Sequence, residues 1–206
     1  MTSDPTSVTS GTAANRGPRD RMVVHAADLI GRDGVAATSI GDVIAASSAP
    51  RGSIYHHFPG GKTQLMIEAV RYGGDFISHR ISRESSATPA EAVAEIGDVW
   101  RRMLVNTDFE FGCPVLAGGL ARRSEPEIAD EADGIFARWT GLISTRLVHE
   151  GVEIDRADSL AQLIIAAIEG AVGLCQTRRS VEPLDRVIAE LARLCDSAAA
   201  ASRGPA

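Results

Sequence analysis

Aromatic residues and cysteines are both scarce in this sequence. Aromatic side chains make up 4% of its 206 residues, and the remaining apolar residues, mostly Ala, Leu, Ile and Val, recur at helical spacings. This pattern favours an all-α fold over paired β-strands. The three cysteines, Cys113, Cys175 and Cys195, form no CxxC pair, and no signal peptide precedes them. We therefore expect reduced thiols in a cytoplasmic protein.

Several other features are lacking. No uninterrupted apolar run reaches the roughly 18 to 20 residues that span a bilayer, so no membrane partner is expected. No nucleophile elbow, P-loop, dinucleotide fingerprint or HExxH motif occurs, which disfavours an enzyme and a bound cofactor. His56 and His57 are adjacent, so on a helix their side chains diverge by about 100° and suit a shared metal ion poorly.

Positive charge is not in excess either. The formal net charge is −6, which taken alone disfavours a nucleic-acid partner. The acidic excess is uneven, however: residues 1–80 carry 8 basic and 7 acidic side chains, whereas residues 81–206 carry 13 and 20. The N-terminal part is therefore compatible with nucleic acid if a few residues such as Arg51 and Lys62 lie at the interface.

The most informative stretch is residues 38–62, TSIGDVIAASSAPRGSIYHHFPGGK, whose spacing predicts a helix, a tight turn and a second helix. Ile40, Val43 and Ile44 fall at i, i+3 and i+4 and form one apolar stripe, and Thr38 is placed as the N-cap. Pro50 suits the first turn of the second helix, because its missing N–H costs nothing there.

The second predicted helix separates an apolar side from a small polar side. At 100° per residue, Ile54 and Phe58 lie within about 40° of each other, and Gly52, Ser53 and His56 lie on the other side. A helix of this kind fits the major groove of DNA, where arginine can bind guanine and small polar groups can hold phosphates. The alternative is a plain helical hairpin with surface histidines.

The run from Tyr55 to Phe58, followed by Lys62, resembles the helix-turn-helix of the TetR family of bacterial transcriptional repressors. The version found here, APRGSIYHHFPGGK, is most similar to the multidrug- and flavonoid-responsive (LmrA-like) subgroup. One departure lies in the turn, where most members have Gly and this chain has Ser47, Ser48 and Ala49; a non-glycine residue rarely adopts positive φ. The resemblance implies that operator DNA contacts Thr38, Ser48, Arg51, Gly52, Ser53, Tyr55, His56 and Lys62.

We expect a three-helix DNA-binding head at residues 18–62 and a helical ligand-binding and dimerisation body at 63–200, between a disordered arm (1–17) and tail (201–206). Capping boxes predict helix starts at Thr88 with Glu91 and at Ser124 with Glu127. A helix from Lys62 to about Ser82 contains Gly73 and Gly74, which indicate either a hinge or close packing.

A ligand site is predicted in the body because most of the few aromatic residues fall there, and apolar pockets between helices commonly hold small molecules. Plain core packing is the alternative for each of them. The candidate effector-binding residues are Trp100, Met103, Leu104, Phe111, Cys113, Phe136, Trp139, Ile143, Ile164 and Ile168.

The last two helices are the predicted dimer interface. Residues 160–174 are apolar nearly all round, and the final helix carries a narrow apolar seam, so one side of this pair can face a second subunit. The resemblance implies a four-helix bundle between subunits; burial within a monomer is the alternative. The interface candidates are Leu160, Ala167, Leu174, Leu184, Val187, Ile188, Leu191 and Leu194.

These patterns and the resemblance together predict a homodimeric transcriptional repressor that binds a palindromic operator and releases it when a small apolar or aromatic effector binds. The rival hypothesis is a helical-bundle enzyme or small-molecule carrier in which the helix-turn-helix serves as scaffold.

Overall fold

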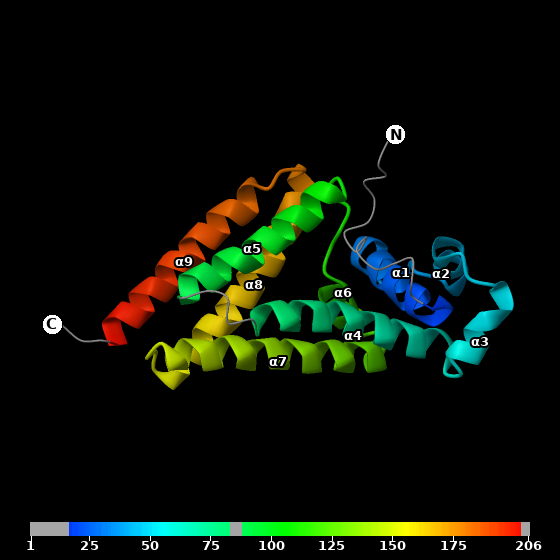
Figure 1. The fold of residues 1–206 in the computed structure, drawn as a ribbon, viewed down its shortest axis with the longest axis horizontal. Coiled ribbons are helices and arrows are strands. Elements are labelled where there is room, and N and C mark those ends of the chain that lie inside the picture. The colour runs from blue at the N-terminus through cyan, green and yellow to red at the C-terminus, as the bar shows by residue number, and fades with distance from the viewer. Residues whose placement is uncertain (1–16, 83–87, 203–206) are drawn as a thin grey trace. The chain divides into compact units, whose positions relative to one another are not determined.

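The computed structural model describes residues 17–82 and 88–202, and all regular structure in these ranges is helical (Figure 1). The predicted arm and tail lie outside these ranges, except for Gly17 and for residues 201 and 202, which continue the last helix. The helices are α1 (Pro18–Asp33), α2 (Ile40–Ser47), the 3-10 helix η2 (Arg51–Ser53), α3 (Ile54–His57), α4 (Gly61–Ile81), α5 (Pro89–Asn106), α6 (Pro114–Leu120), α7 (Pro126–His149), α8 (Ile154–Arg178) and α9 (Glu182–Ser202).

The chain forms two compact units. The first comprises residues 1–76 and 111–136, and the second comprises residues 77–110 and 137–206. Helices α4 and α7 each begin in the first unit and end in the second. The predicted boundary between head and body at residue 62 stays a prediction.

The core of the first unit consists largely of residues that the helical periodicity places on the inward side. Met22, Ala26, Ile54 and Phe58 are fully or almost fully buried, as expected for three short helices that share one apolar centre. Among the large apolar residues of α2, Val43 is fully buried, and Ile40 and Ile44 are half-buried at the margin of the core. The short α2 helix therefore presents a narrower apolar face than its sequence suggests.

Two glycines let α4 pack closely against its neighbours in the first unit. A Cβ atom added at Gly73 would lie 2.5 Å from Pro114 Cγ in α6, and one added at Gly74 would lie 2.7 Å from Ile135 Cγ2 in α7. Because α4 runs unbroken through both positions, the packing explanation accounts for these glycines. Arg71, on the same helix, forms an ion pair of 2.6 Å with Glu131 of α7.

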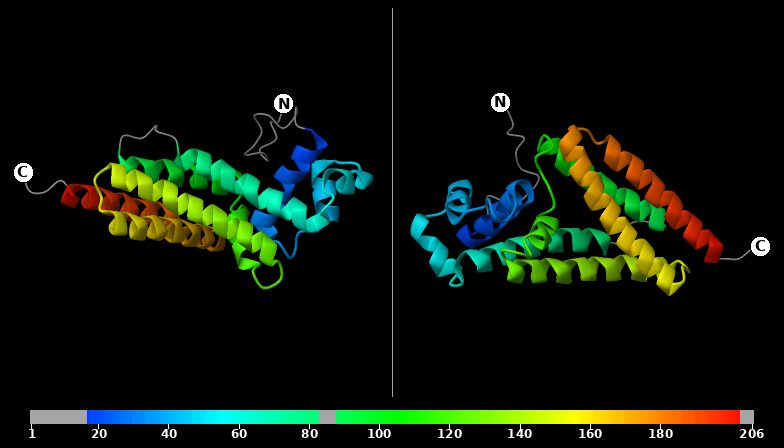
Figure 2. Two further views of the ribbon diagram at one scale, coloured as in Figure 1. Left: turned by 90° about the horizontal axis from the view of Figure 1, so that it is seen from below. Right: turned by 180° about the vertical axis from the view of Figure 1, so that it is seen from behind.

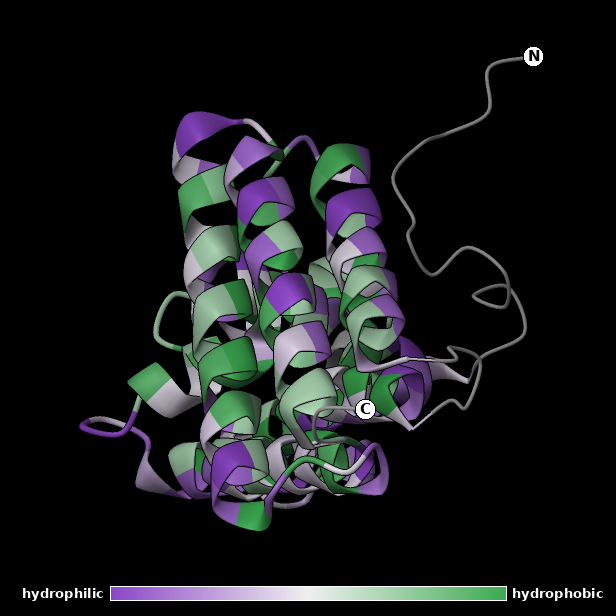
Figure 3. Ribbon diagram, turned by 90° about the vertical axis from the view of Figure 1, so that its left-hand side faces the viewer, coloured by the Kyte–Doolittle hydropathy of each residue, from purple (hydrophilic) through white to green (hydrophobic). Residues whose placement is uncertain are grey.

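In the second unit, α5, α8 and α9 run side by side (Figure 2). Gly97 of α5 lies against Ile188 of α9, and an added Cβ would come within 2.6 Å of the isoleucine side chain. An ion pair between Arg101 and Asp185, 2.6 Å long, joins the same two helices. Hydrophobic and hydrophilic residues alternate around the helices (Figure 3), which fits amphipathic helices packed in a bundle.

Helix α8 has the length and composition of a membrane span, with a mean hydropathy of 1.5 over an 18-residue window. A search for uninterrupted apolar runs misses it, because Gln162 and Glu169 interrupt its apolar sequence. Of that window, 44% is buried inside the protein, where α8 packs against α9 and α5. The core helix of a globular bundle has the same length and composition, so these features are weak evidence for a membrane span.

One of the two predicted capping boxes forms. Thr88 accepts a hydrogen bond from the backbone N–H of Glu91, and the Glu91 carboxylate accepts one from the Thr88 backbone. The predicted box at Ser124 is wrong. The Ser124 hydroxyl donates instead to the carbonyl of Ala121 at 3.3 Å, because α7 begins two residues later, at Pro126.

Candidate functional site

The helix-turn-helix forms with a serine at the position of the turn that needs a left-handed backbone. Ser48 follows α2 and has φ 51° and ψ 34°, and its N–H bonds to the carbonyl of Ala45 at 3.4 Å. This conformation ends the helix as a glycine would, with the steric cost of a Cβ atom. Arg21 of α1 donates to the carbonyl of Ser47 at 3.2 Å, which satisfies a carbonyl of the last turn of α2.

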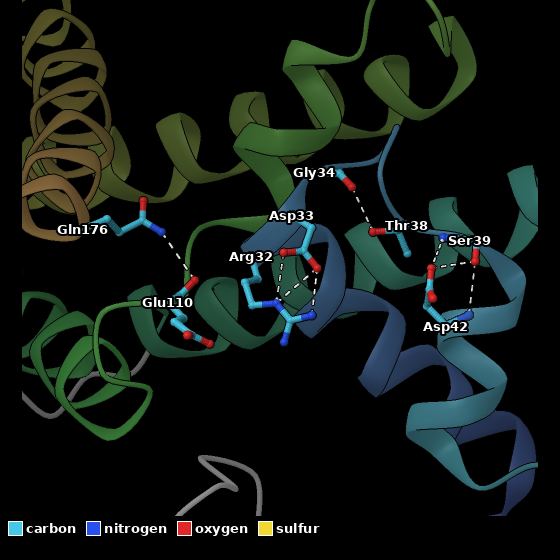
Figure 4. A network of polar contacts seen from close by, with 8 residues as sticks. All are labelled: Arg32, Asp33, Gly34, Thr38, Ser39, Asp42, Glu110 and Gln176. Atoms are coloured by element: carbon cyan, nitrogen blue, oxygen red, sulfur yellow. Dashed lines mark hydrogen bonds and ion pairs between the residues drawn. The ribbon is translucent and has the colours of Figure 1, made fainter.

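The first helix of the motif is capped by Ser39 and not by Thr38 (Figure 4). Ser39 Oγ accepts from the N–H of Asp42 at 3.2 Å, and the Asp42 carboxylate accepts from the Ser39 N–H at 3.0 Å. The Ser39 hydroxyl also donates to the Asp42 carboxylate at 2.6 Å, and this bond, together with the one from the Ser39 backbone, lowers the pKa of Asp42. Thr38 is buried and donates its hydroxyl to the carbonyl of Gly34 at 2.8 Å, so it tethers the end of α1 to the start of α2.

The second helix of the motif is short and begins as a 3-10 turn. Pro50 accepts from both the N–H and the hydroxyl of Ser53, at 2.9 and 2.7 Å, and this bond over three residues defines η2. Helix α3 ends at His57, because Phe58 precedes Pro59 and takes a non-helical backbone with φ −131° and ψ 79°. The predicted second helix is thus a 3-10 turn followed by one turn of α-helix.

The polar side of this short segment faces solvent, as predicted. Gly52, Tyr55 and His56 are exposed, and Ser53 is half-buried. Tyr55 is 67% exposed, which is unusual for so large a side chain, whereas Ile54 beside it is buried in the core. The segment therefore holds its apolar residues inward and projects an aromatic hydroxyl and an imidazole outward.

Lys62 stands in the first turn of α4, one residue after Gly61, which has φ 65°. Its ammonium is 3.5 Å from the carbonyl of Val35, so the side chain extends beside the α1–α2 connection. Arg19 of α1 pairs with Glu68 of α4 at 2.6 Å and lies 5.1 Å from the centre of the Phe58 ring. Arg19 and Arg21 position the motif, and sequence periodicity gave no signal for either.

A cavity opens in the second unit between the ends of several helices. It encloses about 460 Å³ of space not filled by atoms, a volume that includes the part open to solvent. Its lining comes from α4, α5, α7, α8 and α9: Arg80, Ile81, Pro89, Ala92, Val93, Glu95, Ile96, Ile143, Arg146, Leu147, Ile164 and Cys195.

Among the predicted effector-binding residues, Ile143 and Ile164 line this cavity. Trp100 and Trp139 are each 2% exposed and do not line it, and the indole N–H of Trp139 donates to the Ser78 hydroxyl at 3.0 Å. The remaining candidates divide between the units, with Phe111, Cys113 and Phe136 in the first and Met103, Leu104 and Ile168 in the second. Their assignment to an effector site stays a prediction that this cavity does not support.

The cysteines are buried in the core. Cys113 is the N-cap of α6, where its sulfur accepts from the N–H of Leu116 at 3.4 Å. Burial raises the pKa of Cys175, and burial together with Asp196 raises the pKa of Cys195 to about 11. Cys195, at the cavity wall, is therefore a neutral thiol near pH 7. No cluster of three or more metal-ligating side chains occurs within the described part of the chain.

The predicted interface residues divide by burial within the single chain. Leu160, Leu184 and Leu191 are buried, and Ile188 packs against Gly97, so these four side chains already have partners in their own unit. Leu174 and Leu194 are 47% and 37% exposed, and Ala167 and Val187 are half-buried. Leu163, which the sequence patterns did not single out, is 45% exposed one turn before Ala167 on α8.

Residues 23–69 match the family profile described as bacterial regulatory proteins of the tetR family, and residues 89–190 match the LmrA/YxaF-like C-terminal domain of transcriptional regulators. The chain is 42% identical over 186 residues to an uncharacterized HTH-type transcriptional regulator of Mycobacterium tuberculosis, covering 87% of this chain and 94% of that protein. It is 32% identical over 171 residues to the HTH-type transcriptional regulator LmrA of Bacillus subtilis, covering 81% and 90%.

Solved structures show the same fold. A TetR transcriptional regulator from Chloroflexus aurantiacus superposes with a TM-score of 0.71 at 28% identity, covering 87% of this chain and 94% of that one. A TetR transcriptional regulator from Legionella pneumophila gives a TM-score of 0.77 at 24% identity, covering 87% and 97%.

Proposed function

Because the chain belongs to the TetR family of transcriptional regulators, with an LmrA/YxaF-like C-terminal domain, we propose that it is a cytoplasmic, ligand-responsive repressor that binds a palindromic operator as a homodimer. The observation that carries this proposal is the exposed polar side of η2 and α3, held by a buried apolar side on a capped helix-turn-helix. A helical-bundle enzyme or carrier has no comparable support.

In this proposal, η2 and α3 enter the major groove. Tyr55, His56, Ser53 and the Gly52 backbone are exposed or half-buried and can reach base edges or phosphates, and Arg51 at the start of η2 would bind guanine. Thr38 is buried, so Ser39, exposed at the N-terminus of α2, takes its place among the candidate phosphate contacts. Ser48 contributes through the geometry of its turn.

The response to a ligand would follow from the cavity in the second unit. A ligand that binds one geometry of the dimer more tightly than another shifts the balance between them, and only by that difference in affinity. An effector that favours a spacing of the two DNA-binding segments unlike that of the operator half-sites would release the DNA.

The test begins with recovery of an operator by selecting genomic DNA fragments that the purified protein binds. Binding to the recovered fragment is then measured over a range of salt concentrations for wild type and Lys62→Ala. A phosphate contact predicts weaker binding to every sequence and a salt slope smaller by about one unit, because one fewer counterion is released.

The matched control is Arg186→Ala, which removes one positive charge at an exposed position of α9. It should leave the salt slope unchanged. Failure to recover any fragment bound in preference to random DNA would refute the operator-binding proposal, and equal slopes for Lys62→Ala and wild type would remove Lys62 from the interface.

A further inference from the structure

The segment proposed to read DNA, η2 followed by α3, has little structure of its own to fix its direction. Helix α3 is four residues long, and no side chain caps it. Its inward contacts come from Ile54 and Phe58, which are 1% and 0% exposed. Apolar contacts hold a segment in place but are not directional. The direction of α3 is therefore sensitive to polar contacts at its end, where a turn at residues 58–61 leads into α4.

A line of hydrogen bonds runs from this turn along α4. The N–H of Gly60 donates to Gln64 Oε1 at 2.8 Å, and Gln64 Nε2 donates to Glu68 Oε1 at 3.0 Å. The three positions are four residues apart, so they lie on one side of α4 and of the turn that precedes it. Glutamine suits the middle position because its amide has both an acceptor for the Gly60 N–H and a donor for the Glu68 carboxylate.

Arg19 of α1 closes this line into a ring. Its guanidinium donates to Glu68 Oε2 at 2.6 Å and also lies 5.1 Å from the centre of the Phe58 ring, so the contacts return to the residue that ends α3. Glu68 is available to Arg19 because Arg71, one turn further along α4, pairs with Glu131 of α7 at 2.6 Å. The ring of contacts therefore joins the end of α3 to both α1 and α4.

We propose that Arg19, Gln64 and Glu68 form a positioning network that sets the direction of η2 and α3, and so determines the preference for the operator over other DNA. This inference rests on the proposed operator binding, and none of the three side chains is assigned a contact with DNA. Hydrogen bonds to base edges depend on the direction of the side chains that make them, whereas phosphate contacts carry no sequence information. Loss of the network should therefore weaken binding to the operator more than binding to random DNA.

The test measures the ratio of the affinities for the recovered operator and for random DNA of the same length. Arg19→Gln, Glu68→Gln and Gln64→Met each break one link of the network. Each should lower the ratio about tenfold, the loss of discrimination expected when about one base contact is misplaced.

Charge alone predicts a different pattern. Glu68→Gln removes a negative charge and should bind random DNA slightly more tightly, whereas Arg19→Gln removes a positive charge and should bind it more weakly. A fall in the ratio in both variants, despite opposite changes in charge, is the result expected of positioning. Arg19→Lys keeps a charged donor for Glu68 and should retain most of the preference.

The control is Asp130→Asn, which removes one negative charge from the same unit and breaks an ion pair with Arg122 outside the network. It should leave the ratio unchanged. If an ion-pair variant unfolds, Gln64→Met provides the test, since it is uncharged and similar in size to the wild-type residue. An unchanged ratio in Glu68→Gln or Gln64→Met, or an equal fall in Asp130→Asn, would overturn the proposal.

Exchange of the Gly60 amide proton, followed by NMR without DNA, separates this inference from the proposed function. The proton should exchange faster in Gln64→Met, which lacks the acceptor, and exchange at the wild-type rate would overturn the network whatever the DNA result. A wild-type protein that prefers no DNA fragment would refute operator binding, and this inference with it. A wild-type protein that prefers the operator, beside variants with the same preference, would refute the positioning role alone.

Discussion

At the scale of single residues, the N-cap of α2 could not be assigned from the sequence, because two adjacent residues suit that position. Thr38 and Ser39 both carry the hydroxyl that an N-cap needs, and the apolar spacing of α2 does not say which one precedes the helix. The choice is made by the end of α1, where the carbonyl of Gly34 accepts the Thr38 hydroxyl and holds that side chain in the core. Ser39 is left to cap the helix.

We predict that Ser39→Ala lowers the free energy of unfolding by about 1 kcal/mol, because the N–H of Asp42 loses its acceptor. Ser39→Thr keeps the hydroxyl and should cost less. Urea denaturation of both variants provides the measurement. A Ser39→Ala protein as stable as wild type would show that Ser39 does not cap the helix.

The effect of Ser39→Ala should also depend on pH. The pKa of Asp42 is lowered in the folded protein by its bonds to Ser39, so its contribution is present above the unfolded pKa, about 3.9, and is lost as the pH falls through the lower folded value. The difference in stability between wild type and Ser39→Ala should therefore narrow in acid.

At the scale of helices, the sequence predicts most boundaries but few partners. The proline and threonine signals at Pro18, Thr88 and Pro114 mark true helix starts, because they act on the local backbone. The partner of a helix face is not a local property. Neither the packing of Gly73 on Pro114 nor that of Ile188 on Gly97 can be read from the spacing of either residue.

The same limit applies to the candidate sites. The exposed side of α3 was predictable, since Ile54 and Phe58 fix which side of one short helix faces inward. The cavity draws its lining from five helices, so that only Ile143 and Ile164 were found by looking for apolar and aromatic side chains. Lining residues such as Arg80 and Arg146 were missed, because the way in which neighbouring helices meet is not a property of the local sequence.

Gly73→Ala should lower the free energy of unfolding by about 1 to 3 kcal/mol, because the new methyl group would overlap the rigid ring of Pro114. Gly134→Ala is the matched control, since a Cβ at that exposed helical position meets no atom within 4 Å. It should stabilise the protein by about 0.5 to 1 kcal/mol. Thermal or urea denaturation gives both values. A Gly73→Ala protein as stable as wild type would contradict the packing explanation and favour a hinge at that position.

At the scale of the whole molecule, the burial of each side chain within one chain distinguishes residues that pack in its core from residues that can contact a second chain. On α8, Leu163 and Leu174 are almost half exposed, and an added Cβ at Gly170 or Gly173 meets no atom within 4 Å. This side of α8 is thus apolar, free of large neighbours and open to the close approach of another helix. It is the surface through which we propose that the homodimer forms, together with Leu194 of α9.

We predict that Leu174→Asp dissociates the dimer in sedimentation velocity experiments and leaves the helical content of each chain unchanged, because a charge in an apolar interface loses its hydration. Ile188→Asp should instead destabilise the fold by about 2 to 4 kcal/mol, since Ile188 packs against Gly97 inside its own unit. Ala94→Asp, at an exposed position of α5, controls for the added charge. A Leu174→Asp protein that sediments as a dimer would place the interface elsewhere.

The tryptophans and the tyrosines lie in different units. Both tryptophans, Trp100 and Trp139, belong to the second unit and are buried there, whereas both tyrosines, Tyr55 and Tyr72, belong to the first. Light absorbed by indole alone is therefore emitted from the second unit. Tryptophan fluorescence thus reports on the unfolding of that unit without an added label.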